Sequence, residues 1–108
     1  MIKLVVFVPE THAEQVKLAL FDAGAGQQGD YEHCCWQSAG TGQFKPCEGS
    51  DPFIGSKGEL SQVAELRIEM LVDDDRLSHV VKALRAAHPY EEPAFDLLPL
   101  LAVPDFKK

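Results

Sequence analysis

Residues 63–101 read VAELRIEMLVDDDRLSHVVKALRAAHPYEEPAFDLLPLL, and this stretch indicates the fold class most clearly. Apolar and charged side chains alternate over residues 63–72, which is the period of a strand with one face on the core. The three aspartates at 73–75 favour the first turn of a helix, where carboxylates stabilise the free amides. Apolar residues at helical spacing follow until Pro89, and residues 94–101 are apolar again. The stretch therefore predicts a strand, a helix and a second strand.

The N-terminal half also predicts a strand, a helix and a strand, followed by an inserted hairpin and loop. Residues 2–8 form a strand with hydrophobic side chains on both faces, and residues 13–23 carry apolar side chains at helical spacing. A second strand is predicted over residues 31–38. A glycine-containing turn then leads to a short return strand at 43–46, which makes an extra hairpin. Residues 47–58 contain three glycines and a proline, so we expect a loop there.

Together these elements predict an α+β fold, a ferredoxin-like βαββαβ sandwich with an extra hairpin and loop after the second strand. Both helices then lie on one face of an antiparallel sheet. The other face is uncovered in a single copy, and residues 2–8 contribute apolar surface to it. Because large exposed apolar patches are rare on monomers, we expect the protein to be a homo-oligomer.

The composition predicts one globular domain over residues 1–108, with 45% hydrophobic and 25% charged residues. The formal net charge of −7 argues against nucleic acid and anionic membranes as partners, because both require a basic surface. No apolar stretch is long enough to span a bilayer, and no signal-peptide pattern is present. The odd count of three cysteines does not fit a secreted disulfide framework. We therefore expect the chain to begin at its first strand and to be cytoplasmic.

Two segments carry candidate metal ligands. On the predicted second strand, His33 and Cys35 share one face and Cys34 points the other way. His33 and Cys35 would suit zinc or copper if further ligands arrived, and Cys47 in the following loop is a possible neighbour. The alternative is that Cys34 or Cys35 is a small buried hydrophobic residue.

The second segment is the proline-braced turn at residues 88–93. His88 has three interpretations: it caps the preceding helix, it binds a metal beside Glu91 or Glu92, or it carries a proton for a carboxylate neighbour. The two glutamates also fit a solvated charged turn. We find no nucleophile paired with a base at a convincing spacing, so we do not expect an enzyme. The candidate metal ligands are therefore His33, Cys35, His88 and Glu91.

The glycine run offers a weaker candidate site. Gly24, Gly26 and Gly29 match a dinucleotide-binding pattern by letter, but the run follows a helix and leads into a strand, which is the reverse of the required order. A helix end and a turn explain these glycines. An anion site built from their backbone amides is the alternative.

Three motifs then occur in order: GAGQQGDYEHC at residues 24–34, GTGQFKP at 40–46 and AHPYEEPAFD at 87–96. Together they resemble the YqfO-type domain, which is inserted in many Nif-three-like proteins and also occurs alone. The resemblance covers residues 2–101. That domain is similar to CutA, the divalent-cation tolerance protein, and to PII signalling proteins, and residues 88–93 look like the His-x-Tyr-Glu-x-Pro signature of CutA.

The resemblance implies a ferredoxin-like fold and a trimer formed through the sheets, so we favour a trimer over a dimer. CutA is associated with copper and other divalent cations, and PII proteins bind nucleotides and regulate partners. The two-metal site of Nif-three-like proteins, sometimes named a GTP cyclohydrolase, lies in flanking domains that this sequence lacks. We therefore expect a small domain that binds a ligand or a divalent metal, copper or zinc, without catalytic activity. The alternative is a PII-like module that senses a nucleotide through Gly24, Gly26 and Gly29 and contacts a partner protein.

Overall fold

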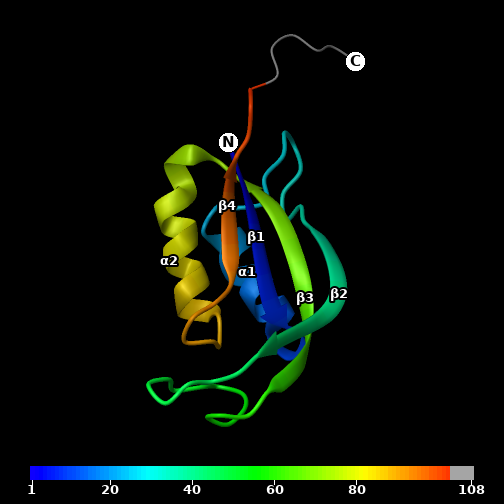
Figure 1. Cartoon of the computed structure of the whole chain (residues 1–108). Helices are drawn as coiled ribbons and strands as arrows, with labels where there is room; N and C mark the ends of the chain where they lie inside the picture. Colours follow the sequence, from blue (N-terminus) through cyan, green and yellow to red (C-terminus); the bar gives the residue numbers. More distant parts are fainter. Residues whose placement is uncertain (103–108) are drawn as a thin grey trace.

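The computed structural model of the chain describes residues 1–102. Four strands form one antiparallel sheet in the order β2-β3-β1-β4, and two helices cover one face of it (Figure 1). This arrangement confirms the predicted ferredoxin-like sandwich. The elements are β1 (Ile2–Pro9), the 3-10 turn η1 (Glu10–His12), α1 (Ala13–Asp22), β2 (Trp36–Phe44), β3 (Ser61–Val72), the 3-10 turn η2 (Asp74–Arg76), α2 (Leu77–Ala87) and β4 (Phe95–Pro99).

The core lies between the sheet and the helices, as the alternating pattern of β3 predicts. Strand β1 sits in the middle of the sheet, paired with β3 and β4, and its Leu4, Val6 and Val8 point toward the helices. Buried residues from both helices, among them Leu20 of α1 and Leu84 of α2, pack against them. Each such apolar side chain adds about 1.5–3 kcal/mol when it is fully removed from water.

The second strand lies later in the chain than predicted, and the predicted extra hairpin is wrong. Strand β2 runs without interruption over Trp36–Phe44 and pairs with β3 along its whole length, so residues 39–42 lie inside a strand instead of a turn. The ladder of hydrogen bonds with β3 outweighs the local preference of glycine for turns. Tyr31 forms only an isolated bridge with Gln28. Of the predicted insertion, residues 1–102 contain the long loop but not the extra hairpin.

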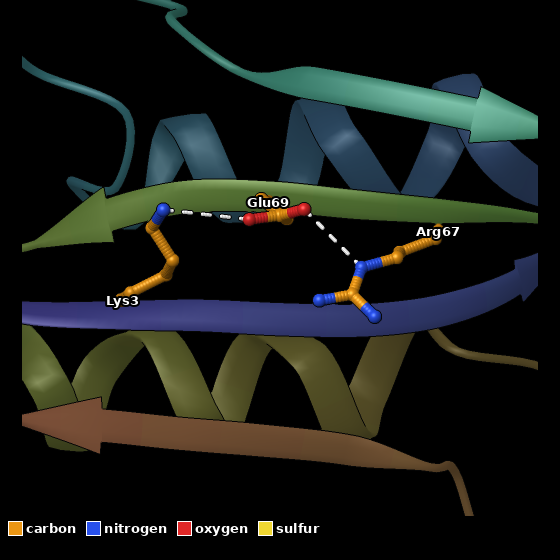
Figure 2. A network of polar contacts seen from close by, with 3 residues as sticks. All are labelled: Lys3, Arg67 and Glu69. Carbon is orange, nitrogen blue, oxygen red and sulfur yellow. Dashed lines mark hydrogen bonds and ion pairs between the residues drawn. The ribbon is translucent and has the colours of Figure 1, made fainter.

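The sheet face that points away from the helices is more polar than predicted at its centre. Glu69 of β3 lies 3.4 Å from Lys3 Nζ and accepts a 3.2 Å hydrogen bond from Arg67 Nε (Figure 2). Val5 of β1, opposite Glu69 in register, is 1% exposed within a single chain. The guanidinium of Arg67 also lies 5.7 Å from the centroid of the Phe7 ring.

Within residues 1–102, large apolar side chains are exposed toward the margins of this open face. Trp36 of β2 is opposite Glu69 in register and is 61% exposed, and Leu98 of β4 is opposite Lys3 and is 47% exposed. Partners directly opposite in a ladder point to the same face, so both side chains lie on the open face.

No helix within residues 1–102 is long and apolar enough to cross a membrane. The cytoplasmic location and the single domain over residues 1–108 stay predictions.

Candidate ligand-binding cavity

A cavity of about 460 Å³ lies where the long loop after β2 approaches the turn between α2 and β4. Figure 1 shows both segments at the same end of the sheet. Phe7 of β1 and Glu65 of β3 reach the cavity from the sheet. Volumes of about 300–1,000 Å³ are typical of small-molecule sites. The rest of the lining comes from residues 42–47, 50, 52–54, 90–92 and 94.

The lining is mainly apolar and rich in aromatic rings. Phe7, Phe44, Phe53 and Tyr90 all contribute to it. The rings of Phe44 and Tyr90 meet edge to face, with their centroids 5.7 Å apart at an angle of 63°. Such edge-to-face pairs hold aromatic rings in defined orientations, so this wall is preformed.

Glu65 is the most buried charged side chain of the cavity, with 8% of the residue exposed. Its Oε2 accepts a 2.8 Å hydrogen bond from the Tyr90 hydroxyl. A Cβ atom added to Gly42, on the neighbouring strand, would overlap the Glu65 carboxylate. A side chain at position 42 would therefore force the Glu65 carboxylate to move.

Tyr90 holds its proton firmly. Burial, together with the hydrogen bond to Glu65 and the negative charge of that carboxylate, raises the pKa of the Tyr90 phenol well above its ordinary value. Tyr90 is thus a permanent hydrogen-bond donor to Glu65 across the physiological pH range.

His88 anchors the turn to the sheet with both ring nitrogens. Its Nε2 lies 2.8 Å from the Phe7 carbonyl oxygen, and the Tyr90 amide donates to its Nδ1 over 3.1 Å. Because a carbonyl can only accept, Nε2 carries the proton, Nδ1 accepts, and the ring is neutral. Burial lowers the pKa of the His88 imidazole, although the hydrogen bond to Phe7 and the charge of Glu65 act in the opposite direction.

This geometry bears on the three interpretations of His88. The backbone of His88 does end α2, where its amide donates to the Leu84 carbonyl over 2.9 Å. The interpretation of a charged imidazolium cap is wrong, because the side chain is neutral and bonds to β1. Metal binding or proton transfer through the ring requires one of its two hydrogen bonds to break.

The four predicted metal ligands are not brought together. Glu91 lines the cavity and its Oε1 accepts a 3.0 Å hydrogen bond from the Asp51 amide, which ties the long loop to the turn. His33 instead stacks on the Phe21 ring with centroids 4.6 Å apart, and Cys35 is exposed beside a second cavity of about 370 Å³. Residues 1–102 contain no group of three or more His, Cys, Asp or Glu side chains that could hold a metal ion.

The expectation that His33 and Cys35 share a strand face is wrong because both precede β2, and His33 has a φ of 58°. All three cysteines are free thiols. Cys34 is partly buried in the segment that precedes β2. Cys47 is exposed and lines the main cavity.

The glycine run connects α1 to the sheet. Gly24 and Gly26 have φ values of 108° and 77°, a region that disfavours other residues. The amide of Gly24 donates to the Phe21 carbonyl and that of Gly26 to the Leu71 carbonyl, over 3.0 and 2.8 Å. Gly29, with a φ of 57°, lies in the turn closed by Gln28 and Tyr31. This geometry fits a helix end and a turn, and two of the three amides are already used within the chain.

Comparison with known proteins gives relatives along almost the whole chain. The chain is 56% identical over 98 residues to the GTP cyclohydrolase 1 type 2 homolog of Halalkalibacterium halodurans, which covers 91% of this chain and 26% of the relative. The homologue of Mycobacterium tuberculosis is 50% identical over 102 residues, covering 94% and 27%. A solved Bacillus cereus protein related to NIF3 superposes with a TM-score of 0.78 at 50% identity, over 92% of this chain and 25% of that one. The chain is a homologue of one segment of NIF3-related proteins. This NIF3-related segment spans about a quarter of the length of the curated relatives it matches.

More distant structures share the fold. The PII-like protein CutA from Nostoc superposes with a TM-score of 0.65 at 19% identity, over 93% of this chain and 81% of that one. CutA1 from Pyrococcus horikoshii gives 0.68 at 16% identity, over 98% and 89%. No protein-family model matches the chain. The resemblance to the YqfO-type domain and to the CutA and PII fold is thereby confirmed.

Proposed function

We propose that this NIF3-related chain is a ligand-binding domain, without catalytic activity of its own, that holds a small organic molecule in the main cavity. The observation that carries the proposal is the combination of a preformed aromatic wall with one buried polar pair, Glu65 and Tyr90. Small-molecule sites typically combine apolar walls with a few fixed polar groups. Cys47 lies among the lining residues, but His88, a potential base, uses both of its ring nitrogens.

A divalent metal, copper or zinc, bound by His33, Cys35, His88 and Glu91 stays a prediction. An organic ligand has more support, because the ligand set is not assembled in residues 1–102. Calorimetric titration of the wild type and of His88→Ala with both metals tests the prediction. Binding that His88→Ala abolishes would favour the metal over the organic ligand.

The nucleotide-sensing alternative draws its support from the PII-like fold alone. The names of the relatives mention GTP cyclohydrolase, but the chain spans about a quarter of their length. We propose that the chain alone does not consume GTP. An assay of GTP loss tests this directly, and nucleotides belong in the ligand panel below.

The proposed assembly is a homo-oligomer, with a trimer favoured, that buries the open sheet face. The exposed Trp36 and Leu98 side chains on that face support it. Phe7 and Glu65 of the ligand cavity lie on this same face, at the end of the sheet where the loop and turn approach it, so the cavity borders the surface that the assembly buries.

The proposal is tested by a thermal-shift screen with small molecules of varied charge and shape. A ligand at a concentration of about 100 times its dissociation constant adds about 2.7 kcal/mol to the free energy of unfolding. This raises the melting temperature of a domain of this size by several degrees. A genuine ligand should stop binding to Ala94→Trp, because Ala94 lines the cavity and the indole fills it. It should still bind to Ala64→Trp, at an exposed strand position that does not line the cavity. Binding that survives in Ala94→Trp would contradict the proposal.

A further inference from the structure

We infer that the ligand of the main cavity is an organic cation, an ammonium group on an apolar body. This inference rests on the proposed function and names the chemical class of its ligand. Three features of the cavity carry it: the partners of Glu65, the balance of charge in the lining, and the aromatic walls.

Glu65 is a buried carboxylate that lacks a cation. In the part of the chain that the structure describes, it accepts one hydrogen bond, from the neutral Tyr90 hydroxyl, and forms no ion pair. Buried carboxylates are costly unless they are paired with charge or with several donors. Glu69 lies four residues further along β3 on the same face. Unlike Glu65, it is paired with cations, because both Lys3 and Arg67 contact it.

The polar end of the cavity offers acceptors. The Tyr90 proton is already donated to Glu65, so the carboxylate and the phenol oxygen can only accept further hydrogen bonds there. A ligand group at this position must therefore donate, as an ammonium does. Glu91 and Glu92 also line the cavity, against a single cationic side chain, Lys45. This balance disfavours anionic ligands, including nucleotides.

The aromatic rings distinguish an organic cation from a bare metal ion. Phe7, Phe44, Phe53 and Tyr90 line the cavity, and aromatic rings attract cations within about 6 Å, whereas a metal ion keeps waters that an apolar lining cannot hydrogen-bond. The Phe7 ring already contacts one cation of the chain, because the Arg67 guanidinium lies 5.7 Å from its centroid.

Three probes that share a phenylethyl body and differ in their polar group test the inference by calorimetry: 2-phenylethylamine, 2-phenylethanol and 3-phenylpropionate. We expect the amine to bind wild type at least ~10-fold more tightly than the alcohol, because a charge-assisted hydrogen bond replaces a neutral one. The propionate should bind most weakly. Glu65→Gln should lose at least ~10-fold of the affinity for the amine and keep that for the alcohol. Glu69→Gln, on the same strand and face but outside the cavity, should bind the amine like the wild type.

Several outcomes would overturn the inference. Alcohol or propionate binding as tight as that of the amine would do so, and so would amine binding unchanged in Glu65→Gln or zinc binding that depends on Glu65. If Glu65→Gln does not fold, the three probes on the wild type still decide. If none of them binds while another panel compound occupies the cavity, the inference fails and the proposed function stands. If no compound occupies it, the proposed function fails as well.

Discussion

His88 shows how one side chain can be structural where its chemistry suggests a ligand. The imidazole accepts from the Tyr90 amide and donates to the Phe7 carbonyl, so it joins the turn to the central strand. It is 5% exposed, and a buried polar group is stable only when such bonds are made. The same bonds place the Tyr90 ring beside Glu65.

The neutral state of His88 predicts a pH dependence of stability. Its pKa in the folded protein lies below the unfolded value of about 6.5, so the unfolded chain binds the proton more readily. The free energy of unfolding should therefore fall as the pH drops through 6.5 toward the folded pKa, and should recover above 6.5. Urea unfolding of His88→Gln at several pH values should show a smaller slope over this range than the wild type.

His79→Gln is the matched control for that experiment, since His79 lies on the exposed side of α2. It should keep the slope of the wild type. A His88→Gln slope equal to that of the wild type would show that His88 does not carry the effect.

Gly42 gives a second prediction at the level of one residue. In Gly42→Ala the new methyl group meets the Glu65 carboxylate, so we expect a loss of about 1–3 kcal/mol in the free energy of unfolding. Gly40→Ala, on the same strand and face, has nothing within 4 Å of the added atom. Its stability should change by less than about 0.5 kcal/mol. Equal effects in denaturant titrations would show that the Glu65 carboxylate is not held over Gly42.

The elements differ in how far their own residues specify them. Periodic burial predicts β1, β3 and α2, because each presents one regular face to the core. Strand β2 has mostly small, polar and glycine residues and lies at the edge of the sheet, so its pattern resembles a turn. Its pairing with β3 then determines where the long loop starts and brings that loop to the turn after α2.

The contact between loop and turn predicts a local effect. Glu91→Ala removes the acceptor of the Asp51 amide, and the exchange of that amide with solvent, measured by NMR, should become several-fold faster. Because this hydrogen bond is exposed, global stability should fall by less than about 1 kcal/mol. Glu92→Ala, at the next position, should leave the Asp51 amide unchanged. Identical exchange in both variants would show that Glu91 does not hold the loop.

The whole molecule has a covered and an uncovered sheet face, and the uncovered one bears on assembly. Its centre is closed by the Lys3, Arg67 and Glu69 network within one chain (Figure 2). The proposed contact between copies therefore depends on the margins, where Trp36 and Leu98 are exposed.

Sedimentation equilibrium at micromolar concentration should give the mass of an oligomer, with a trimer expected. Leu98→Asp should weaken the assembly at least ~10-fold, because it places a charge in an apolar contact beside Asp96. Leu18→Asp changes a comparably exposed leucine on α1 and should leave the mass unchanged. A monomer mass for the wild type would contradict the proposed assembly.

The local sequence pattern alone predicts the sandwich and the residues of its core. Burial on one face gives the apolar residues of each element a regular spacing, which a short stretch of sequence already shows. The candidate site needed the tertiary structure. Glu65 has the same alternating pattern as Arg67 and Glu69, and nothing near it in the chain indicates burial. It is buried because Tyr90, 25 residues away, donates to it and because Gly42 on the neighbouring strand leaves it space. Such pairings depend on the register of strands and the path of loops, which no local period encodes.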